Sequence, residues 1–222
     1  MPSVWIRVAS MSFNIQAYAA ADAINSQYQQ LHPVIVIEGL DGTGKSTQIE
    51  LLAKKLNAHQ LSTSKLMNQP RTKKERYHSY MENNRLASKE MCVIRKHQPI
   101  VVDRYIASTM SSYYAHFSFY PFAFNEWTEP YLGMQNGQLA LHKLTIPTIV
   151  INIELDEPIR VKRLEERGLV LDSNEQKLVE DDNYRTCMKA WLCVMSTITI
   201  DATSMSVEEL HACILLQLQG VI

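Results

Sequence analysis

The chain has 222 residues, of which 46% are hydrophobic, and carries a formal net charge of −1. This length suits a single compact domain, and the balanced charge argues against nucleic-acid binding, which usually shows as a basic excess. The four cysteines form no C-x-x-C pair and no apolar run approaches the length of a bilayer span, which argues against a zinc site, a disulfide framework and a membrane protein.

Residues 1–33 precede the first expected core strand and contain Arg7 and Asp22 as their only charged residues. A mitochondrial presequence is rich in arginine and poor in acids, so this composition favours a surface helix, over residues 17–29, or a disordered extension rather than a targeting segment. We therefore expect a cytoplasmic protein, and a mitochondrial location stays open.

Residues 34–47 read V-I-V-I-E-G-L-D-G-T-G-K-S-T. The four β-branched residues 34–37 are typical of a strand that is buried on both faces of a parallel sheet. Gly39 to Ser46 fit the spacing G-x-x-x-x-G-K-[ST], and an apolar helical pattern follows at once. A strand, a glycine-rich loop and a helix in this order predict a P-loop, in which backbone N–H groups surround a phosphate at a helix N-terminus. Lys45 would reach the β and γ phosphates, and Ser46 would ligate Mg²⁺.

Beyond the P-loop helix we expect a second strand within residues 61–67 and then a basic stretch, N-Q-P-R-T-K-K-E-R, at 68–76. Arg71 lies at a strand-to-helix junction, where anions bind readily. The other basic residues, Lys73, Lys74 and Arg76, are expected on a solvated helix face. A helix is predicted over residues 82–96.

An acidic residue follows the buried strand predicted at Ile100–Val102, in the sequence D-R-Y. Ligands of open α/β sheets bind beyond the carboxyl ends of the strands, and P-loop enzymes keep a metal-facing carboxylate there. We therefore expect Asp103 to face Mg²⁺. Arg104 would hold an acceptor phosphate by a planar, two-pronged contact.

Residues 108–124 are dense in aromatic side chains, which predicts a stretch that faces the core, with one or two rings free to stack on a base. A helix is expected over residues 126–144. The rest of the chain predicts a strand at 148–155, a helix from Pro158, a helix at 183–195, a strand at 198–201 and a closing helix at 207–218.

The helix from Pro158 carries four basic residues, Arg160, Lys162, Arg163 and Arg167, and the polar residues 168–183 show no core pattern. These features predict a mobile lid near 163–183, whose arginines bring positive charge to the transferring phosphates. The alternation of strands and helices predicts the α/β class: one P-loop NTPase domain over residues 34–222, with a parallel sheet and helices on both faces.

The order of these motifs resembles the thymidylate kinase family. The resemblance covers Val34 to the C-terminus and rests on E-G-L-D-G-T-G-K-S-T, on N-R before I-V-V-D-R-Y-I-A-S, on R-L-E-E-R-G and on I-D-A-T. The spacing from N-R to D-R-Y and the lid sequence also resemble the mitochondrial-type UMP/CMP kinase branch. The resemblance implies an ATP- and Mg²⁺-dependent homodimer that phosphorylates a pyrimidine nucleoside monophosphate. The favoured acceptor is dTMP, and the alternative is UMP, CMP or their deoxy forms.

The resemblance also implies roles for individual residues. ATP would bind to Gly39, Leu40, Asp41, Gly42, Thr43, Gly44, Lys45, Ser46 and Thr47, with its adenine against the turn Asp201–Thr203. The acceptor would bind to Asp41 (through its 3′-hydroxyl), Arg71, Arg85 (which reads the base), Arg104, Tyr105, Ser108 and Tyr113. Catalysis would fall to Lys45, Asp103, Arg104, Arg163 and Arg167, with Mg²⁺ at Ser46 and Asp103. A non-catalytic nucleotide-binding regulator is a less favoured alternative, and a GTPase is not expected because the Asn-Lys-x-Asp signature is missing.

Overall fold

A computed structural model describes residues 31–63, 72–116, 132–135, 138–141, 144–168 and 170–220. Its main sheet has five parallel strands in the order β2-β3-β1-β6-β7. The strands are β1 (Val34–Glu38), β2 (His59–Ser62), β3 (Ile100–Asp103), β6 (Ile149–Glu154) and β7 (Ile198–Asp201). The helices are α2 (Lys45–Leu56), α3 (Lys73–Ile94), α4 (Ile106–His116), α5 (Glu157–Glu166), α6 (Ser173–Glu180), α7 (Asp182–Met195) and α8 (Val207–Leu218). The predicted α/β fold with a parallel sheet is confirmed, while the helix predicted at 17–29 lies outside the described residues.

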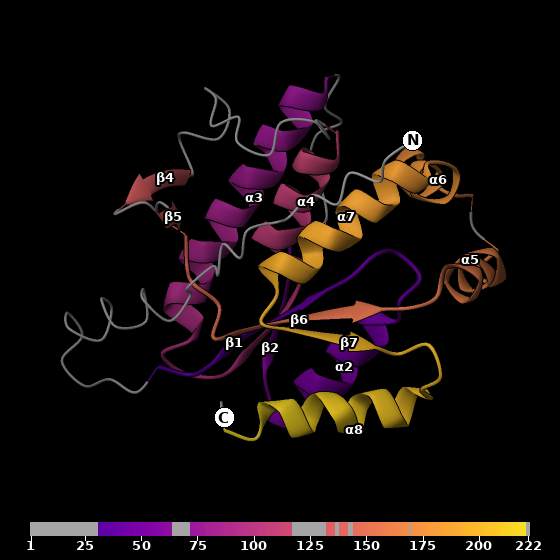
Figure 1. Cartoon of the computed structure of the whole chain (residues 1–222). Helices are drawn as coiled ribbons and strands as arrows, with labels where there is room; N and C mark the ends of the chain where they lie inside the picture. Colours follow the sequence, from indigo (N-terminus) through magenta and orange to yellow (C-terminus); the bar gives the residue numbers. More distant parts are fainter. Residues whose placement is uncertain are drawn as a thin grey trace.

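Helices cover both faces of the sheet (Figure 1): α3, α4 and α7 lie on one face, and α2 and α8 on the other. Strand β1 separates two cores because successive side chains of a strand point to opposite faces. Val34 and Val36 pack in the core beside α3, α4 and α7, whereas Ile35 and Ile37 pack in the core beside α2 and α8. The unbroken apolar run of β1 therefore reports burial on both faces.

Helix α3 begins at Lys73, within the basic stretch that was expected on a helix face and ahead of the helix predicted over residues 82–96. The reason is a capping box: Thr72 Oγ1 accepts a hydrogen bond from Glu75 N, and the Glu75 carboxylate accepts one from Thr72 N. The pattern T-x-x-E marks such a helix start, and the charged residues around it hid that signal. Strand β2 begins at His59, and most of the strand predicted at 61–67 lies outside the described residues.

The helix predicted over residues 126–144 is wrong where the structure describes this segment. Strands β4 (Leu132–Gln135) and β5 (Gln138–Leu141) pair there in an antiparallel hairpin, with Gln135 opposite Gln138. The two residues between these partners are Asn-Gly, the dipeptide that two-residue hairpins prefer. This dipeptide was the available sequence signal for a hairpin.

The segment predicted as a mobile lid contains α6 and joins α5 to α7 near the carboxyl end of β6 (Figure 1). Helix α6 starts with a capping box of Asp172 and Glu175 and buries Leu178 in the core. Residues 168–183 thus do contribute to the core, through one apolar residue, and the mobility of the lid stays a prediction. In the described parts of the chain, none of the helices combines the length and apolar character needed to cross a membrane.

Candidate active site

The P-loop bends at glycines that have left-handed backbones. Gly39 has φ 140°, and a Cβ on it would lie 2.5 Å from the carbonyl oxygen of Ile153. Gly42 has φ 91°, and a Cβ on it would lie 2.9 Å from the carbonyl oxygen of Arg160. At both positions the backbone conformation and the available space require glycine. The loop therefore packs closely against the end of β6 and against α5.

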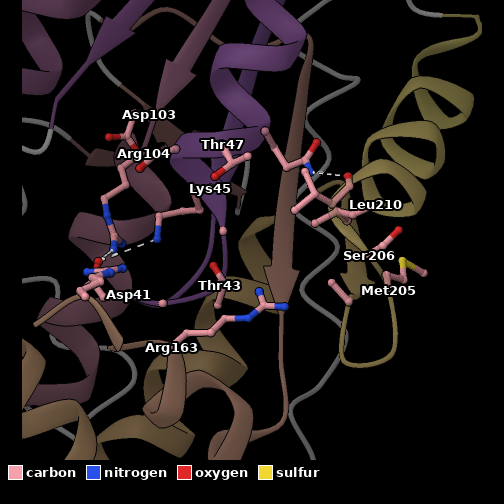
Figure 2. Close-up of a pocket in the computed structure, with 17 residues that line it drawn as sticks. Asp41, Thr43, Lys45, Thr47, Asp103, Arg104, Arg163, Met205, Ser206 and Leu210 are labelled. Atoms are coloured by element: carbon pink, nitrogen blue, oxygen red, sulfur yellow. Dashed lines mark hydrogen bonds and ion pairs between the residues drawn. The ribbon is translucent and has the colours of Figure 1, made fainter. Parts of the chain in front are cut away.

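A cavity of about 590 Å³ lies beside the P-loop, beyond the carboxyl ends of the parallel strands. Among the described residues, six charged side chains line it, four cations and two carboxylates: Lys45, Arg104, Arg163, Arg167, Asp41 and Asp103. Lys45 and Arg104 point toward Asp41, and Arg163 reaches toward the cavity from the α5 side (Figure 2). The excess of positive charge in a concave site suits a polyphosphate.

Lys45 is held inside the loop, with a side chain that is 7% exposed. Its Nζ donates to the carbonyl oxygen of Leu40 at 2.7 Å and lies 3.8 Å from Asp41 Oδ1. Burial and the nearby Arg104 guanidinium lower the pKa of Lys45 to about 7, against the opposing effect of Asp41. A bound phosphate would restore the full charge of this ammonium group.

Asp41 and Arg104 form an ion pair in the cavity through Arg104 Nη2 and Asp41 Oδ1. Arg104 Nη1 also donates to Ser108 Oγ at 3.0 Å. Burial by itself raises the pKa of Asp41, but Arg104 and Lys45 outweigh it and hold this pKa at about 2. The pair is therefore charged across the physiological pH range.

Glu38 has a structural part in the site that the sequence did not reveal. This residue at the end of β1 is fully buried, and its carboxylate accepts hydrogen bonds from Tyr105 N at 2.9 Å, from Ser108 N at 3.1 Å and from Ser108 Oγ. Burial raises the pKa of Glu38, although these donors and Arg104 lower it. Glu38 thereby fixes the start of α4 against the P-loop strand.

Asp103 and Ser46 both line the cavity and fit a Mg²⁺ ion. Asp103 Oδ2 accepts a hydrogen bond from Ser62 Oγ at 3.3 Å, while Oδ1 is buried without a partner among the described residues. Carboxylate and hydroxyl oxygens are the hard ligands that Mg²⁺ prefers. The described chain has no group of three or more His, Cys, Asp or Glu that could hold a metal, and Mg²⁺ binds with one or two carboxylates plus substrate phosphates and water.

The far wall of the cavity is formed by residues after β7 and in α8 (Figure 2), namely Ala202, Met205, Ser206, Val207 and Leu210. Gln48 ties this wall to the P-loop helix, since its Nε2 donates to the carbonyl oxygen of Val207 at 2.9 Å. The turn Asp201–Thr203 had pointed to Ala202. The α8 residues were missed because an ordinary amphipathic helix carries no sign that its first turn lines a ligand cavity.

The predicted acceptor residues are only partly brought together. Asp41 and Arg104 line the cavity and form an ion pair, while Ser108, which accepts a hydrogen bond from Arg104 Nη1, does not line it. Arg71 lies outside the described residues.

Three other predicted acceptor residues, Tyr105, Tyr113 and Arg85, are not among the described residues that line the cavity. Tyr105 is 1% exposed, and its hydroxyl lies 2.6 Å from Ser88 Oγ in the core. Tyr113 is also buried and packs on Tyr77 with ring centroids 4.7 Å apart. Arg85 pairs with Glu82 one turn earlier on α3. The aromatic stretch thus serves the core where it is described.

Two other residues of α3, Arg76 and Tyr80, interact with groups outside their own helix. Arg76, predicted as a solvated charge, donates from Nη1 to Asn174 Oδ1 at 2.8 Å and so connects α3 to α6. Burial raises the pKa of Tyr80, while the charges of Arg76 and Arg104 lower it. Tyr80 therefore shares the electrostatic environment of the Asp41–Arg104 pair, which the sequence did not indicate.

The arginines in and directly after α5 differ in their placement. A Cβ on Gly44 would lie 3.7 Å from Arg163 Nη1, so the Arg163 guanidinium lies next to the P-loop. Within the described residues Arg163 forms no ion pair, whereas Arg167 Nη1 lies 3.2 Å from Glu175 Oε1. Arg160 does not extend toward transferring phosphates, as a lid arginine would. Its side chain is buried against the P-loop backbone.

The parallel sheet, the P-loop and the cationic cavity define a P-loop nucleotide-binding protein of the α/β class. A family model described as thymidylate kinase matches residues 37–214, and the chain belongs to this family. The protein is therefore a phosphotransferase of the nucleoside monophosphate kinase type, as the sequence predicted.

Two kinases are among the solved structures that resemble the chain. A thymidylate kinase from Candida albicans has a TM-score of 0.61 and 18% identity, with 86% of this chain and 92% of that chain covered. A deoxyadenosine kinase from M. mycoides with bound dCTP has a TM-score of 0.49 and 18% identity, with 84% and 99% covered. The first similarity supports the fold. A comparison with curated protein sequences found no match.

Proposed function

We propose that the protein transfers the γ-phosphoryl group of ATP to dTMP, which yields ADP and dTDP. The observation that carries this proposal is that two cations meet at one carboxylate oxygen. Asp41 Oδ1 lies 3.8 Å from Lys45 Nζ and pairs with Arg104 Nη2. Lys45 belongs to the donor-phosphate loop, and Arg104 is the cation proposed for the acceptor phosphate. In-line transfer requires the two phosphates to be adjacent, and this arrangement supports it.

The proposed reaction needs no covalent intermediate with the protein. The bond between the γ-phosphorus and the bridging oxygen of ATP breaks, and a bond to an oxygen of the acceptor phosphate forms. Lys45 and the loop N–H groups would bind the donor phosphates, and Arg104 would orient the acceptor. Ser46 and Asp103 would hold Mg²⁺, which neutralises charge on the phosphate oxygens when it is bound. Arg163 and Arg167 would supply further positive charge.

The remaining roles are proposed on the family resemblance. Asp41 would bind the 3′-hydroxyl of the acceptor, and Arg85 would read the base after leaving Glu82. Residues 163–183 would act as the lid, and the protein would be a cytoplasmic homodimer without nucleic-acid or membrane partners. The apolar α8 wall, with Met205 and Leu210, supports a place for adenine.

The test is ADP release in the presence of ATP and Mg²⁺, with dTMP, dUMP, UMP, CMP and dCMP presented separately. Strongest turnover with dTMP is the expected result, and Lys45→Ala should abolish it. A preference for UMP or CMP would move the protein to the UMP/CMP branch with the same mechanism. ATP binding without turnover of any acceptor would overturn the enzymatic function.

A further inference from the structure

Arg160 is the largest fully buried side chain among the described residues, and only 1% of it is exposed. Burying a guanidinium group is unfavourable unless its donors are satisfied and its charge is paired. Arg160 belongs to α5, which follows strand β6. It is not among the described residues that line the nucleotide cavity. Its contacts therefore need an explanation other than direct binding of phosphate.

The Arg160 guanidinium joins three parts of the chain. Nη1 donates to the carbonyl oxygen of Asp41 in the P-loop at 2.9 Å. Nε donates to Glu157 Oε2 at 2.8 Å, and Nη2 bonds to Glu157 Oε1. Nη2 also donates to the carbonyl oxygen of Leu178, in the last turn of α6, at 3.3 Å. One side chain thus connects the P-loop, the start of α5 and the end of α6.

The peptide that accepts a hydrogen bond from Arg160 is that of Asp41, and its position affects the charged groups of the site. Its neighbour Gly42 packs so closely on α5 that a Cβ would lie 2.9 Å from the carbonyl oxygen of Arg160. The side chain of Asp41 pairs with Arg104 and lies close to Lys45. Rotation of the Asp41 peptide would move this carboxylate and, with it, the two cations proposed to bind the donor and acceptor phosphates.

We propose that Arg160 is a positioning residue for phosphoryl transfer. It fixes the Asp41 peptide, so that the Asp41 carboxylate holds Arg104 beside Lys45, and it ties this geometry to α6. The inference rests on the proposed kinase function and adds a residue that contacts neither nucleotide. A lysine cannot reproduce the role, because its single ammonium group lacks the planar fork that serves several acceptors at once.

Arg185 on α7 provides a matched control. Its Nη1 donates to the same Leu178 carbonyl oxygen at 2.8 Å, and its Nε lies 3.5 Å from Glu157 Oε2. Its side chain is 13% exposed, and among the described residues none of its hydrogen-bond or ion-pair partners belongs to the P-loop. R160K and R185K therefore weaken the same network, and only R160K disturbs the hydrogen bond to Asp41.

The first measurement compares kcat, KM and thermal stability of the two variants with dTMP and ATP. We expect R160K to lower kcat about tenfold, the size of one lost charge-assisted hydrogen bond that positions a reacting group, with a smaller change in the KM of ATP. R185K should lower Tm by about as much as R160K does, but it should keep the kcat of the wild type. In a D41A background R160K should no longer change kcat, since the carboxylate that it positions is absent.

A second measurement does not depend on turnover. Amide hydrogen exchange of residues 39–45 in the free protein should be faster in R160K and unchanged in R185K. If R160K does not fold, R160Q, whose amide still donates one hydrogen bond, is compared in the same way. Equal effects of R160K and R185K on kcat and loop exchange, or no effect of R160K on either, would overturn the proposal. If the wild type phosphorylates no monophosphate, the proposed function fails, and loop exchange alone decides the role of Arg160.

Discussion

Arg104 reaches Asp41 from a left-handed backbone, with φ 59°. This conformation costs an arginine about 1–2 kcal/mol, and three contacts offset the cost. Arg104 N donates to the carbonyl oxygen of Ile37 at 3.1 Å, Thr63 Oγ1 donates to the carbonyl oxygen of Arg104 at 3.0 Å, and the guanidinium binds Asp41. Backbone strain of this kind concentrates at functional sites, and here it directs the guanidinium into the cavity.

Asp41→Asn should lower the free energy of unfolding at pH 7 by about 1.5–3 kcal/mol, the usual value of a hydrogen bond to a charged group. The folded pKa of Asp41 is about 2, below its ordinary value of 3.8. The stabilisation by this carboxylate is therefore complete above about pH 4 and is lost as the pH falls through 2. Urea unfolding of both proteins between pH 7 and pH 2 measures the difference.

Asp182→Asn is the control, because Asp182 is 84% exposed, so water screens its ion pair with Arg185. It should change stability by less than about 0.5 kcal/mol at any pH. A loss for Asp41→Asn that stays constant from pH 7 to pH 2 would show that the charge of Asp41 does not stabilise the fold.

ATP binding should take up a proton at Lys45. The pKa of Lys45 is about 7 in the free protein, and a bound phosphate favours the charged form. Binding at pH 8 should therefore take up close to one proton, and binding at pH 6 almost none. Calorimetry in two buffers with different ionisation enthalpies measures this uptake.

Lys45→Arg is the control for proton uptake, since a guanidinium group stays protonated throughout this range. The variant keeps a cation in the loop, so binding remains measurable, and its proton uptake at pH 8 should disappear. An uptake at pH 8 that persists in Lys45→Arg would assign the proton to another group.

The layers of the fold and the P-loop were predictable from the sequence because their determinants are local. The run Val34–Ile37 and the spacing from Gly39 to Ser46 fix a buried strand and its loop without any tertiary information. The position of Asp103 beside the cavity was predictable for a similar reason, since the carboxyl ends of parallel strands meet at one edge of the sheet.

The side-chain placements that the sequence did not reveal depend on distant contacts. Arg160 reads as one more lid arginine until the fold places Asp41 and Leu178 around it. Tyr105 follows Asp103 and Arg104 directly in sequence, yet its ring turns into the core toward Ser88. Side chains that bind over long sequence separations leave no periodic pattern, so motif spacing cannot report them.

Gly39→Ala should destabilise the protein by roughly 3–5 kcal/mol, from left-handed strain and overpacking together. The added Cβ would lie 2.5 Å from the carbonyl oxygen of Ile153, a backbone atom that cannot move away easily. Gly168→Ala is the matched control: Gly168 has φ 63° but nothing within 4 Å of an added Cβ. It should cost only about 1–2 kcal/mol. Equal losses in urea unfolding would mean that strain alone, and not the close packing on β6, explains the glycine.

Arg163→Ala should lower kcat about 10³-fold, the lower range for an arginine that stabilises a transferring phosphoryl group, with a smaller change in the KM of ATP. Arg163 lines the cavity and, within the described residues, needs to break no ion pair to reach a phosphate. Arg167→Ala should have a smaller effect, because Arg167 must first leave Glu175. Steady-state kinetics with saturating dTMP measures both variants.

Lys162→Ala is the control for these two variants. Lys162 lies on the same helix, is 75% exposed, pairs with Glu166 at 3.9 Å and does not line the cavity. The substitution removes one positive charge from α5 but leaves in place the cations that line the cavity, so kcat should stay at the wild-type value. A fall in kcat as large as that of Arg163→Ala would mean that the general positive field of α5, and not the placement of Arg163, supports phosphoryl transfer.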